Sequence, residues 1–182
     1  NINSLTVNPE GHISVQSSNS NATATLKIVG NAELAFSEGK MLEIGGSNSN
    51  NRGAIQATGV TFTALDTADG WSGIDFLNYA DDDNSTLDNC VIEYADDGIY
   101  CASASPTIIN STIRNNTDGI DASSSSQPTI TGNTFTGNTR PVSIYANRIR
   151  NNIDGNTLSN NTKNYIEVQN ATLDEDLTYV WA

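Results

Sequence analysis

Residues 106–146 read PTIINSTIRNNTDGIDASSSSQPTITGNTFTGNTRPVSIYA, and one pattern is written twice within this stretch. When the first copy is laid over the second, Ile108 matches Ile130 and Ile120 matches Val142, at a spacing of 22 residues. Short apolar triplets separated by Asn, Gly or Ser at such a period are typical of a coil of three short strands that stacks on its own copies. The stretch therefore predicts an all-β solenoid.

The repeat can be followed from Ala54 to the C-terminal part of the chain as four apolar columns. In chain order these columns are Ile55, Leu87, Ile108, Ile130 and Ile153; Val60, Ile92, Ile113, Phe135 and Leu158; Ile74, Ile99, Ile120, Val142 and Ile166; and Phe76, Cys101, Ala122, Ile144 and Val168. The last two columns share an inward face because strand side chains alternate. Apolar runs of three to five residues in the first third have strand length as well, so we expect one cylinder with a continuous core.

Composition limits what this cylinder can bind. The 182 residues suffice for a single domain, which we assign to residues 1–182, and they carry a net charge of -13. Nucleic acid and anionic membranes are poor partners for such a surface, whereas cations such as calcium are candidate ligands. No run is long and apolar enough to cross a bilayer, so we expect no membrane insertion.

The two cysteines do not indicate a disulfide scaffold or a zinc site. Cys90 and Cys101, with the lone His12, supply too few ligands for zinc. Cys101 falls at an inward position of its column, which predicts a small buried apolar side chain.

Asparagines recur at the predicted corners of the coil. Asn116, Asn138 and Asn161 share one repeat position, and Asn89 matches Asn110 at another. Asparagine tolerates left-handed backbone angles, and its amide bonds to neighbouring backbone. We therefore interpret these residues as stacked corner ladders with a structural role.

The chain resembles right-handed parallel β-helix repeat proteins, the group that includes pectate lyase-like folds. The stretch IQATGVTFTALDTADGWSGIDF, residues 55–76, is similar to the entry of non-catalytic β-helix modules in secreted and cell-surface bacterial or archaeal proteins. The tail ATLDEDLTYVWA, residues 171–182, resembles the opening of a following module. The resemblance implies a right-handed parallel β-helix of about seven to eight coils, an extracellular or cell-surface location, and a place in a larger multi-module chain.

The same resemblance includes enzymes, but their motifs do not match here. Pectate lyases of this fold use an arginine base beside calcium-binding carboxylates, and polygalacturonases use clustered aspartates. Neither catalytic motif can be placed on this sequence residue by residue. A catalytic interpretation therefore depends on the columns alone.

One outward column carries the best candidate site. Between the inward pairs it reads Asp75, Tyr100, Asp121, Ser143 and Glu167, and just before this strand stand Asp97, Asp118 and Arg140. Neighbouring coils lie about 4.8 Å apart, so Asp75 and Asp121 are expected at roughly 9 to 10 Å. That is at or beyond the upper limit of about 9.5 Å for the carboxyl pair of an inverting glycosidase.

Three interpretations of this acidic face stay open. It is a solvated surface; or it binds calcium or carbohydrate through Asp75, Asp97, Tyr100, Asp118, Asp121 and Arg140, with Asp97 and Asp118 as metal ligands; or it is catalytic through Asp75, Asp121 and Arg140. The loop run Asp81, Asp82 and Asp83 is a second candidate cation site, although it lacks the glycine and distal glutamate of an EF-hand.

Trp71 also has two interpretations, since it could stack on a sugar or pack over the edge of a coil. Its sequence context favours packing.

From the sequence we expect a non-catalytic module that serves as a rigid stalk, in adhesion, or as a polysaccharide-binding unit. We expect it to require no cofactor, although calcium is a candidate ligand. Its expected partners are an extracellular polysaccharide, a surface protein or adjacent modules of the same chain. The alternative is a polysaccharide lyase or glycoside hydrolase that uses the acidic face.

Overall fold

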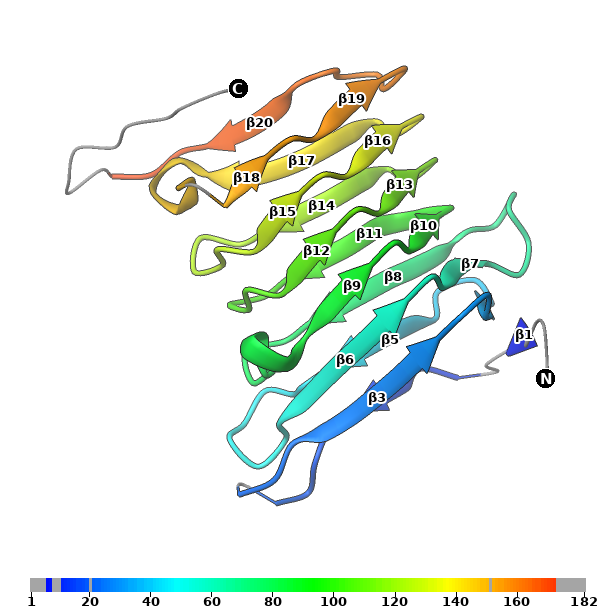
Figure 1. The fold of residues 1–182 in the computed structure, drawn as a ribbon, viewed down its shortest axis with the longest axis vertical. Helices are drawn as coiled ribbons and strands as arrows, with labels where there is room; N and C mark the ends of the chain where they lie inside the picture. The colour runs from blue at the N-terminus through cyan, green and yellow to red at the C-terminus, as the bar shows by residue number, and fades with distance from the viewer. Residues whose placement is uncertain (1–5, 8–10, 20, 151, 173–182) are drawn as a thin grey trace.

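The chain winds into a three-sided cylinder of short parallel strands (Figure 1). A computed structural model describes residues 6–7, 11–19, 21–150 and 152–172. Within these ranges the only helical segments are two short 3₁₀ turns, η1 (Asp82–Asn84) and η2 (Ala146–Arg148). No helix in the described part of the chain has the length and apolarity that crossing a membrane would require.

Three parallel sheets form the sides of the cylinder, and the chain visits sheets C, A and B in turn. Sheet A consists of β1 (Thr6–Val7), β4 (Glu33–Phe36), β7 (Thr61–Ala64), β10 (Val91–Glu93), β13 (Thr112–Arg114), β16 (Thr134–Thr136) and β19 (Thr157–Ser159). Sheet B consists of β2 (Ile13–Val15), β5 (Met41–Ile44), β8 (Trp71–Phe76), β11 (Ala95–Cys101), β14 (Asp118–Ala122), β17 (Arg140–Tyr145) and β20 (Ile166–Gln169). Sheet C consists of β3 (Ala24–Val29), β6 (Gly53–Thr58), β9 (Thr86–Asp88), β12 (Thr107–Ile109), β15 (Thr129–Thr131) and β18 (Ile153–Asp154).

This architecture confirms the predicted all-β parallel solenoid. Consecutive strands of each sheet are separated by two strands of the other sheets, which is the connectivity of a β-helix. The predicted seven to eight coils stay a prediction, since residues near both ends fall outside the described ranges. Most of the segment 171–182, which resembles a following module, lies outside them as well.

The strand register confirms the two columns predicted for sheet B. Ile99 pairs with Ile74 and Ile120, and the column continues through Val142 to Ile166. Its members Ile74, Ile99 and Ile120 are fully buried. Val168, at the end of the neighbouring column, is 50% exposed because β20 is the outermost described strand of the sheet.

Two predicted columns were wrong in their first member. Leu87 pairs with Ala57 rather than Ile55, and Ile92 pairs with Phe62 rather than Val60. Strand side chains repeat every two residues, so positions two apart share a face and both are buried here. The apolar pattern alone therefore could not fix the register of this coil.

Trp71 is an internal packing residue. It is 2% exposed, its ring stacks on Phe36 at a centroid distance of 4.5 Å, and its Nε1–H donates to the carbonyl of Glu93 at 2.9 Å. The sugar-platform interpretation is therefore wrong. Cys101 is fully buried, as predicted.

The predicted asparagine ladder is present at the corner between sheets A and B. The backbone N–H of Asn116 donates to the Asn138 amide oxygen, and the N–H of Asn138 donates to that of Asn161, each at 3.0 Å. Asn89 and Asn110 both have left-handed backbone, as expected, with φ of 51° and 52°. The predicted ladder between these two is wrong, because the N–H of Asn89 donates to the carbonyl of Ile109 and the Asn110 amide donates to Asp88 at 3.0 Å. These corners keep successive strands in register, so the outward side chains also line up from coil to coil.

Candidate functional site

The candidate site lies on the outer face of sheet B, where outward side chains stack along the cylinder. The register aligns Asp75 with Tyr100, Tyr100 with Asp121, and Asp121 with Ser143. The column extends to Glu167 at one end and, beyond the predicted set, to Glu43 at the other. Sheet B therefore presents a straight line of mostly acidic groups.

A second acidic column runs beside the first, at the start of the same strands. Asp97 pairs with Asp118, and Asp118 pairs with Arg140. On the other side Asp97 pairs with Gly73, and the register shifts between Asp97 and Ile99 as in a β-bulge. Gly73 has φ of 115°, and a Cβ there would lie 1.6 Å from the carbonyl oxygen of Asp97. Glycine and the irregular register together set the backbone that carries Asp97.

Three of the predicted ligands come together. Asp97, Asp118 and Asp121 each offer a carboxylate oxygen, and these atoms all lie within 4.8 Å of one another. All three side chains are half-buried. Hard oxygen ligands at this spacing suit a calcium ion, which takes six to eight of them, so three carboxylates leave room for water or a ligand.

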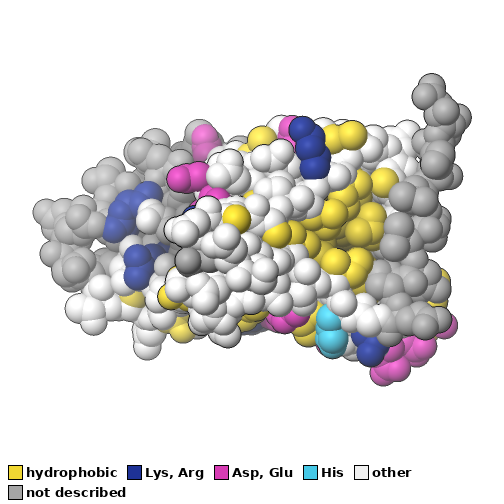
Figure 2. Space-filling model, turned by 90° about the horizontal axis from the view of Figure 1, so that it is seen from below, with side chains coloured by type: hydrophobic (Ala, Val, Ile, Leu, Met, Phe, Trp, Pro, Cys, Tyr) yellow, Lys and Arg dark blue, Asp and Glu magenta, His cyan; other side chains and the backbone are white. Residues whose placement is uncertain are grey.

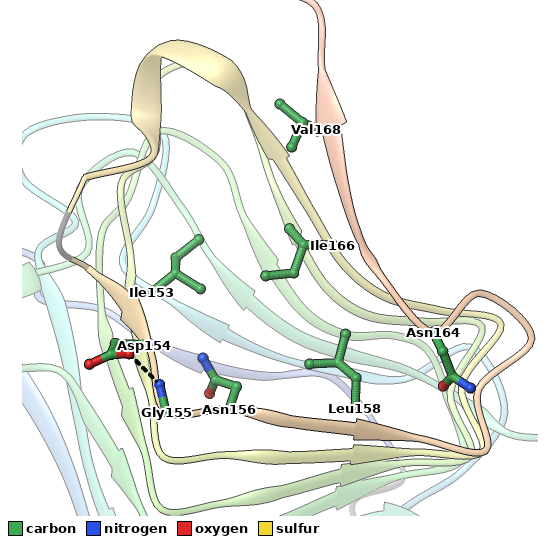
Figure 3. A pocket seen from close by; sticks show the side chains of 8 residues that line it. All are labelled: Ile153, Asp154, Gly155, Asn156, Leu158, Asn164, Ile166 and Val168. Carbon is green, nitrogen blue, oxygen red and sulfur yellow. Dashed lines mark hydrogen bonds between the residues drawn. The ribbon is translucent and has the colours of Figure 1, made fainter. Parts of the chain in front are cut away.

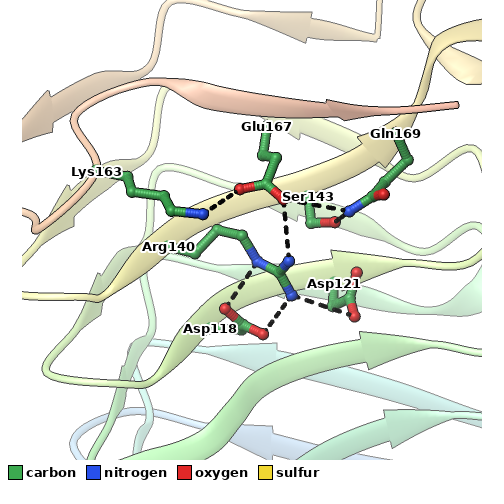
Figure 4. A network of polar contacts seen from close by, with 7 residues as sticks. All are labelled: Asp118, Asp121, Arg140, Ser143, Lys163, Glu167 and Gln169. Carbon is green, nitrogen blue, oxygen red and sulfur yellow. Dashed lines mark hydrogen bonds and ion pairs between the residues drawn. The ribbon is translucent and has the colours of Figure 1, made fainter.

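Arg140 neutralises one side of this cluster (Figure 4). Its guanidinium holds Asp118 in a two-pronged ion pair, with Nε–Oδ1 at 2.8 Å and Nη2–Oδ2 at 2.5 Å. The longer contacts are to Asp121 at 3.7 Å and to Glu167 at 3.4 Å. Glu167 also binds Lys163 at 2.5 Å. Asp97 has no cationic partner among the ion pairs of the described residues.

Burial, together with neighbouring carboxylates, raises the pKa of two aspartates on this face. Burial raises the pKa of Asp97 to about 6, with further contributions from Asp118 and Asp121. Burial and the charge of Glu43 raise the pKa of Asp75 to about 6 as well. Both groups therefore hold protons near pH 6 that an ordinary aspartate would have lost.

Arg140 is poorly suited to act as a base. The hydrogen bond to Asp118 is the main cause that raises the pKa of Arg140 above its usual range. A guanidinium must lose a proton before it can remove one from a substrate, and these carboxylates oppose that loss. The catalytic role considered for Arg140 therefore has no electrostatic support in this arrangement.

The aspartates of the η1 loop point to separate partners. Asp81 accepts hydrogen bonds from Thr23 and Asn84, each at 3.0 Å, and lies 3.5 Å from Arg52. Asp82 instead accepts the backbone N–H of Ser105 at 2.8 Å. Among the described residues these aspartates do not form a metal-sized group.

Sequence reasoning missed Lys163 and Gln169, which complete the network. Gln169 donates to the Ser143 hydroxyl at 3.0 Å and to Glu167 at 3.5 Å. Lys163 stands four residues before Glu167 on the turn that leads into β20. The sequence did contain a signal for Lys163. Glu167 belongs to the acidic outward column, and Lys163 stands four residues before it.

Comparison with known proteins identifies a family and nothing closer. No curated protein and no solved structure gave a match. Residues 45–178 match the family model described as right handed beta helix region, which covers more than half of the sequence. The three parallel sheets are the structure expected of that family. The chain therefore belongs to the right-handed β-helix family.

Proposed function

We propose that this chain is a rigid, non-catalytic β-helix module of a larger secreted or cell-surface protein, and that its acidic face binds anionic polysaccharide through calcium. The observation that carries the proposal is the group of Asp97, Asp118 and Asp121, whose carboxylate oxygens lie within 4.8 Å of one another. Arg140 supplies one positive charge against three negative ones. A divalent cation would remove the remaining repulsion.

Net charge explains why a cation belongs in this proposal. The chain carries a charge of -13 and would repel a polyuronate on its own. A calcium ion held by three carboxylates keeps free coordination positions, and a uronate carboxylate can fill them. Tyr100, which pairs with Asp121 on the same face, provides an aromatic ring beside these positions for a sugar to contact.

Thermal unfolding with and without calcium tests the cation site. Calcium should raise the Tm of the wild type, and the Asp97→Asn/Asp118→Asn variant should lose that rise. Asp69→Asn/Asp96→Asn is the matched control, because it removes the same charge at two exposed positions. An unchanged Tm at millimolar calcium, or an equal loss in both variants, would reject the site.

Polysaccharide binding needs its own assay. Polygalacturonate and alginate should retain the protein in calcium and release it in EDTA, while a neutral glucan should not retain it. If the protein stays bound to these polymers in EDTA, calcium does not mediate the binding. A protein that binds calcium but none of these polymers would leave a calcium-stabilised stalk.

A hydrolase is the second candidate, and the state of Asp75 is the observation in its favour. With its pKa raised to about 6, Asp75 could donate a proton as a general acid. Asp121 lies two strands away, across Tyr100. Release of reducing ends from polygalacturonate or a neutral glucan by wild type, lost in Asp75→Asn, would establish this function.

A further inference from the structure

A cavity of about 450 Å³ lies at the C-terminal end of the cylinder. Figure 3 shows Ile153, Leu158 and Ile166 pointing into it from β18, β19 and β20, one strand of each sheet. Within the described residues none of these strands has a neighbour on its outer side. The core is apolar in cross-section at the other end as well, where Figure 2 shows apolar side chains gathered in the middle of the end face. The group that suits the C-terminal cavity is therefore an apolar segment.

Two series of buried positions lead toward this cavity, one in the turn before sheet C and one in the strand that follows. In each coil the second position comes four residues after the first, as in Ala104 and Ile108, Ser126 and Ile130, and Ile149 and Ile153. All six residues are buried. Successive pairs lie 22 and then 23 residues apart, so the step between these coils is nearly constant.

The sequence after the described residues continues both series. Leu173 and Leu177 are four residues apart, and they stand 24 residues after Ile149 and Ile153. Both leucines lie within residues 45–178, the range that matches the family model. Because the residues are apolar and the step continues the series, the repeat predicts a further strand of sheet C that contains Leu177.

The backbone of β18 presents hydrogen-bonding groups to such a strand. The carbonyls of Asn152 and Asp154 accept the N–H groups of Ile130 and Gly132 at 2.7 and 3.0 Å, so they face β15. Successive residues of a strand direct their N–H and C=O groups to opposite sides, so those of Ile153 face the outer edge of the sheet. A parallel strand with its leucine beside Ile153 would continue the ladder.

Charge favours the same register. Residues 174–176, which separate the two leucines, read DED, whereas Arg148 and Arg150 flank Ile149. With a step of 24 residues, Asp174 falls beside Arg150 on the neighbouring coil. Opposite charges at adjacent positions of paired strands attract each other. The acidic run would therefore lie along a basic part of the preceding coil.

We propose that residues 173–178 form a further strand of sheet C, which pairs with β18 and covers the C-terminal cavity with Leu173 and Leu177. The occupant of the apolar end is then the chain's own next segment. Pairing also covers the edge of β18, and an uncovered edge is a template for association with other chains. This inference does not depend on whether the acidic face binds calcium.

Disulfide formation tests the register. Asp154 is exposed on β18, and Thr178 would lie beside it at a Cα separation of about 4.8 Å, which a disulfide can bridge. Under mild oxidation Asp154→Cys/Thr178→Cys should form its disulfide at least about tenfold faster than Asp154→Cys/Asp176→Cys, whose Cα atoms would be diagonal neighbours at about 7–8 Å. Cys90 and Cys101 are buried, so the wild type gives the background rate. Equal rates for the two engineered pairs would overturn the proposal.

A polar substitution tests the packing over the cavity. Leu177→Asn should lower the Tm by about 5 °C or more, because it removes the apolar side chain expected beside Ile153. Thr178→Asn is the matched control, since Thr178 would face outward, and it should change the Tm by about 2 °C or less. Circular dichroism at low temperature establishes that both variants are folded. An unchanged Tm in Leu177→Asn, or an equal fall in both variants, would show that the segment does not cover the cavity.

Discussion

Replacing Asn138 with alanine tests whether the corner ladder holds the coils together. The side chain is 1% exposed. Its amide oxygen accepts the backbone N–H and the Nδ2–H of Asn116 at 3.0 and 3.1 Å. Its own Nδ2 donates to the carbonyl of Ile113 at 2.9 Å and to the amide oxygen of Asn161 at 3.1 Å.

The magnitude follows from the groups that alanine would leave unpaired. In the alanine variant the backbone N–H of Asn116 loses its acceptor, and the carbonyl of Ile113 loses its donor, inside a buried corner. A buried polar group without a partner costs about 1–3 kcal/mol, so two such groups cost about 2–6 kcal/mol. We expect the free energy of unfolding to fall by about 4 kcal/mol, between these limits.

Urea unfolding followed by circular dichroism gives this difference from the change in midpoint at constant slope. Asn115→Ala is the matched control, since Asn115 is the adjacent asparagine, is exposed and has left-handed backbone with φ of 56°. Losing that conformational preference costs about 1 kcal/mol. If Asn138→Ala destabilises no more than Asn115→Ala, the ladder does not carry the stability assigned to it.

Three further predictions concern sheet B. The pKa of Asp97 is raised from 3.8 to about 6, so between these pH values the folded protein binds more protons than the unfolded chain, and its stability should fall as the pH rises through this window. Asp97→Asn should therefore flatten the dependence of Tm on pH. An unchanged pH dependence in this variant would contradict the assignment. Gly73→Ala should lower the free energy of unfolding by at least about 2 kcal/mol because of its positive φ and the contact with Asp97, whereas Gly11→Ala, where a Cβ meets nothing within 4 Å, should be near neutral in urea unfolding. Arg140→Gln should lower the Tm without calcium and enlarge the calcium-induced rise, because it removes the cation beside Asp118; a smaller rise in scanning calorimetry would place Arg140 among the groups that help to hold the ligand.

Much of the fold could be predicted because two signals agree over the middle coils. Apolar residues recur at one spacing, and asparagines mark the corners, so Ile120 and Val142 could be aligned without a structure. The columns of the first coils could not be aligned in the same way because the turns of these coils vary in length. There Ile55 and Ala57 both face inward, and only the hydrogen-bonded register decides between them.

The candidate site was partly predictable for a related reason. The alignment of Asp97, Asp118 and Arg140 follows from the repeat, since each begins the same strand in its coil. The proximity of Asp121 to both acidic residues depends on how the side chains turn, which no sequence pattern encodes. The burial of Trp71 likewise depends on its contact with Phe36, a partner from the preceding coil.

Stacking identical residues has opposite consequences for amides and for carboxylates. An asparagine amide both donates and accepts, so each asparagine of the ladder through Asn116 and Asn138 finds a hydrogen-bond partner in the next one. Two carboxylates stacked at about 4.8 Å repel each other by roughly 1 kcal/mol in water and about 3.5 kcal/mol at an effective dielectric of 20.

The outer face of sheet C shows the neutral alternative, since Thr86, Thr107 and Thr129 fill one outward column there. Sheet B instead pairs Asp97 with Asp118 at the cost of that repulsion, and Arg140 compensates only part of it. The packing of the coil does not require acidic residues at these positions. A divalent cation at this spacing would offset the repulsion, which is the role that the proposed function gives to calcium.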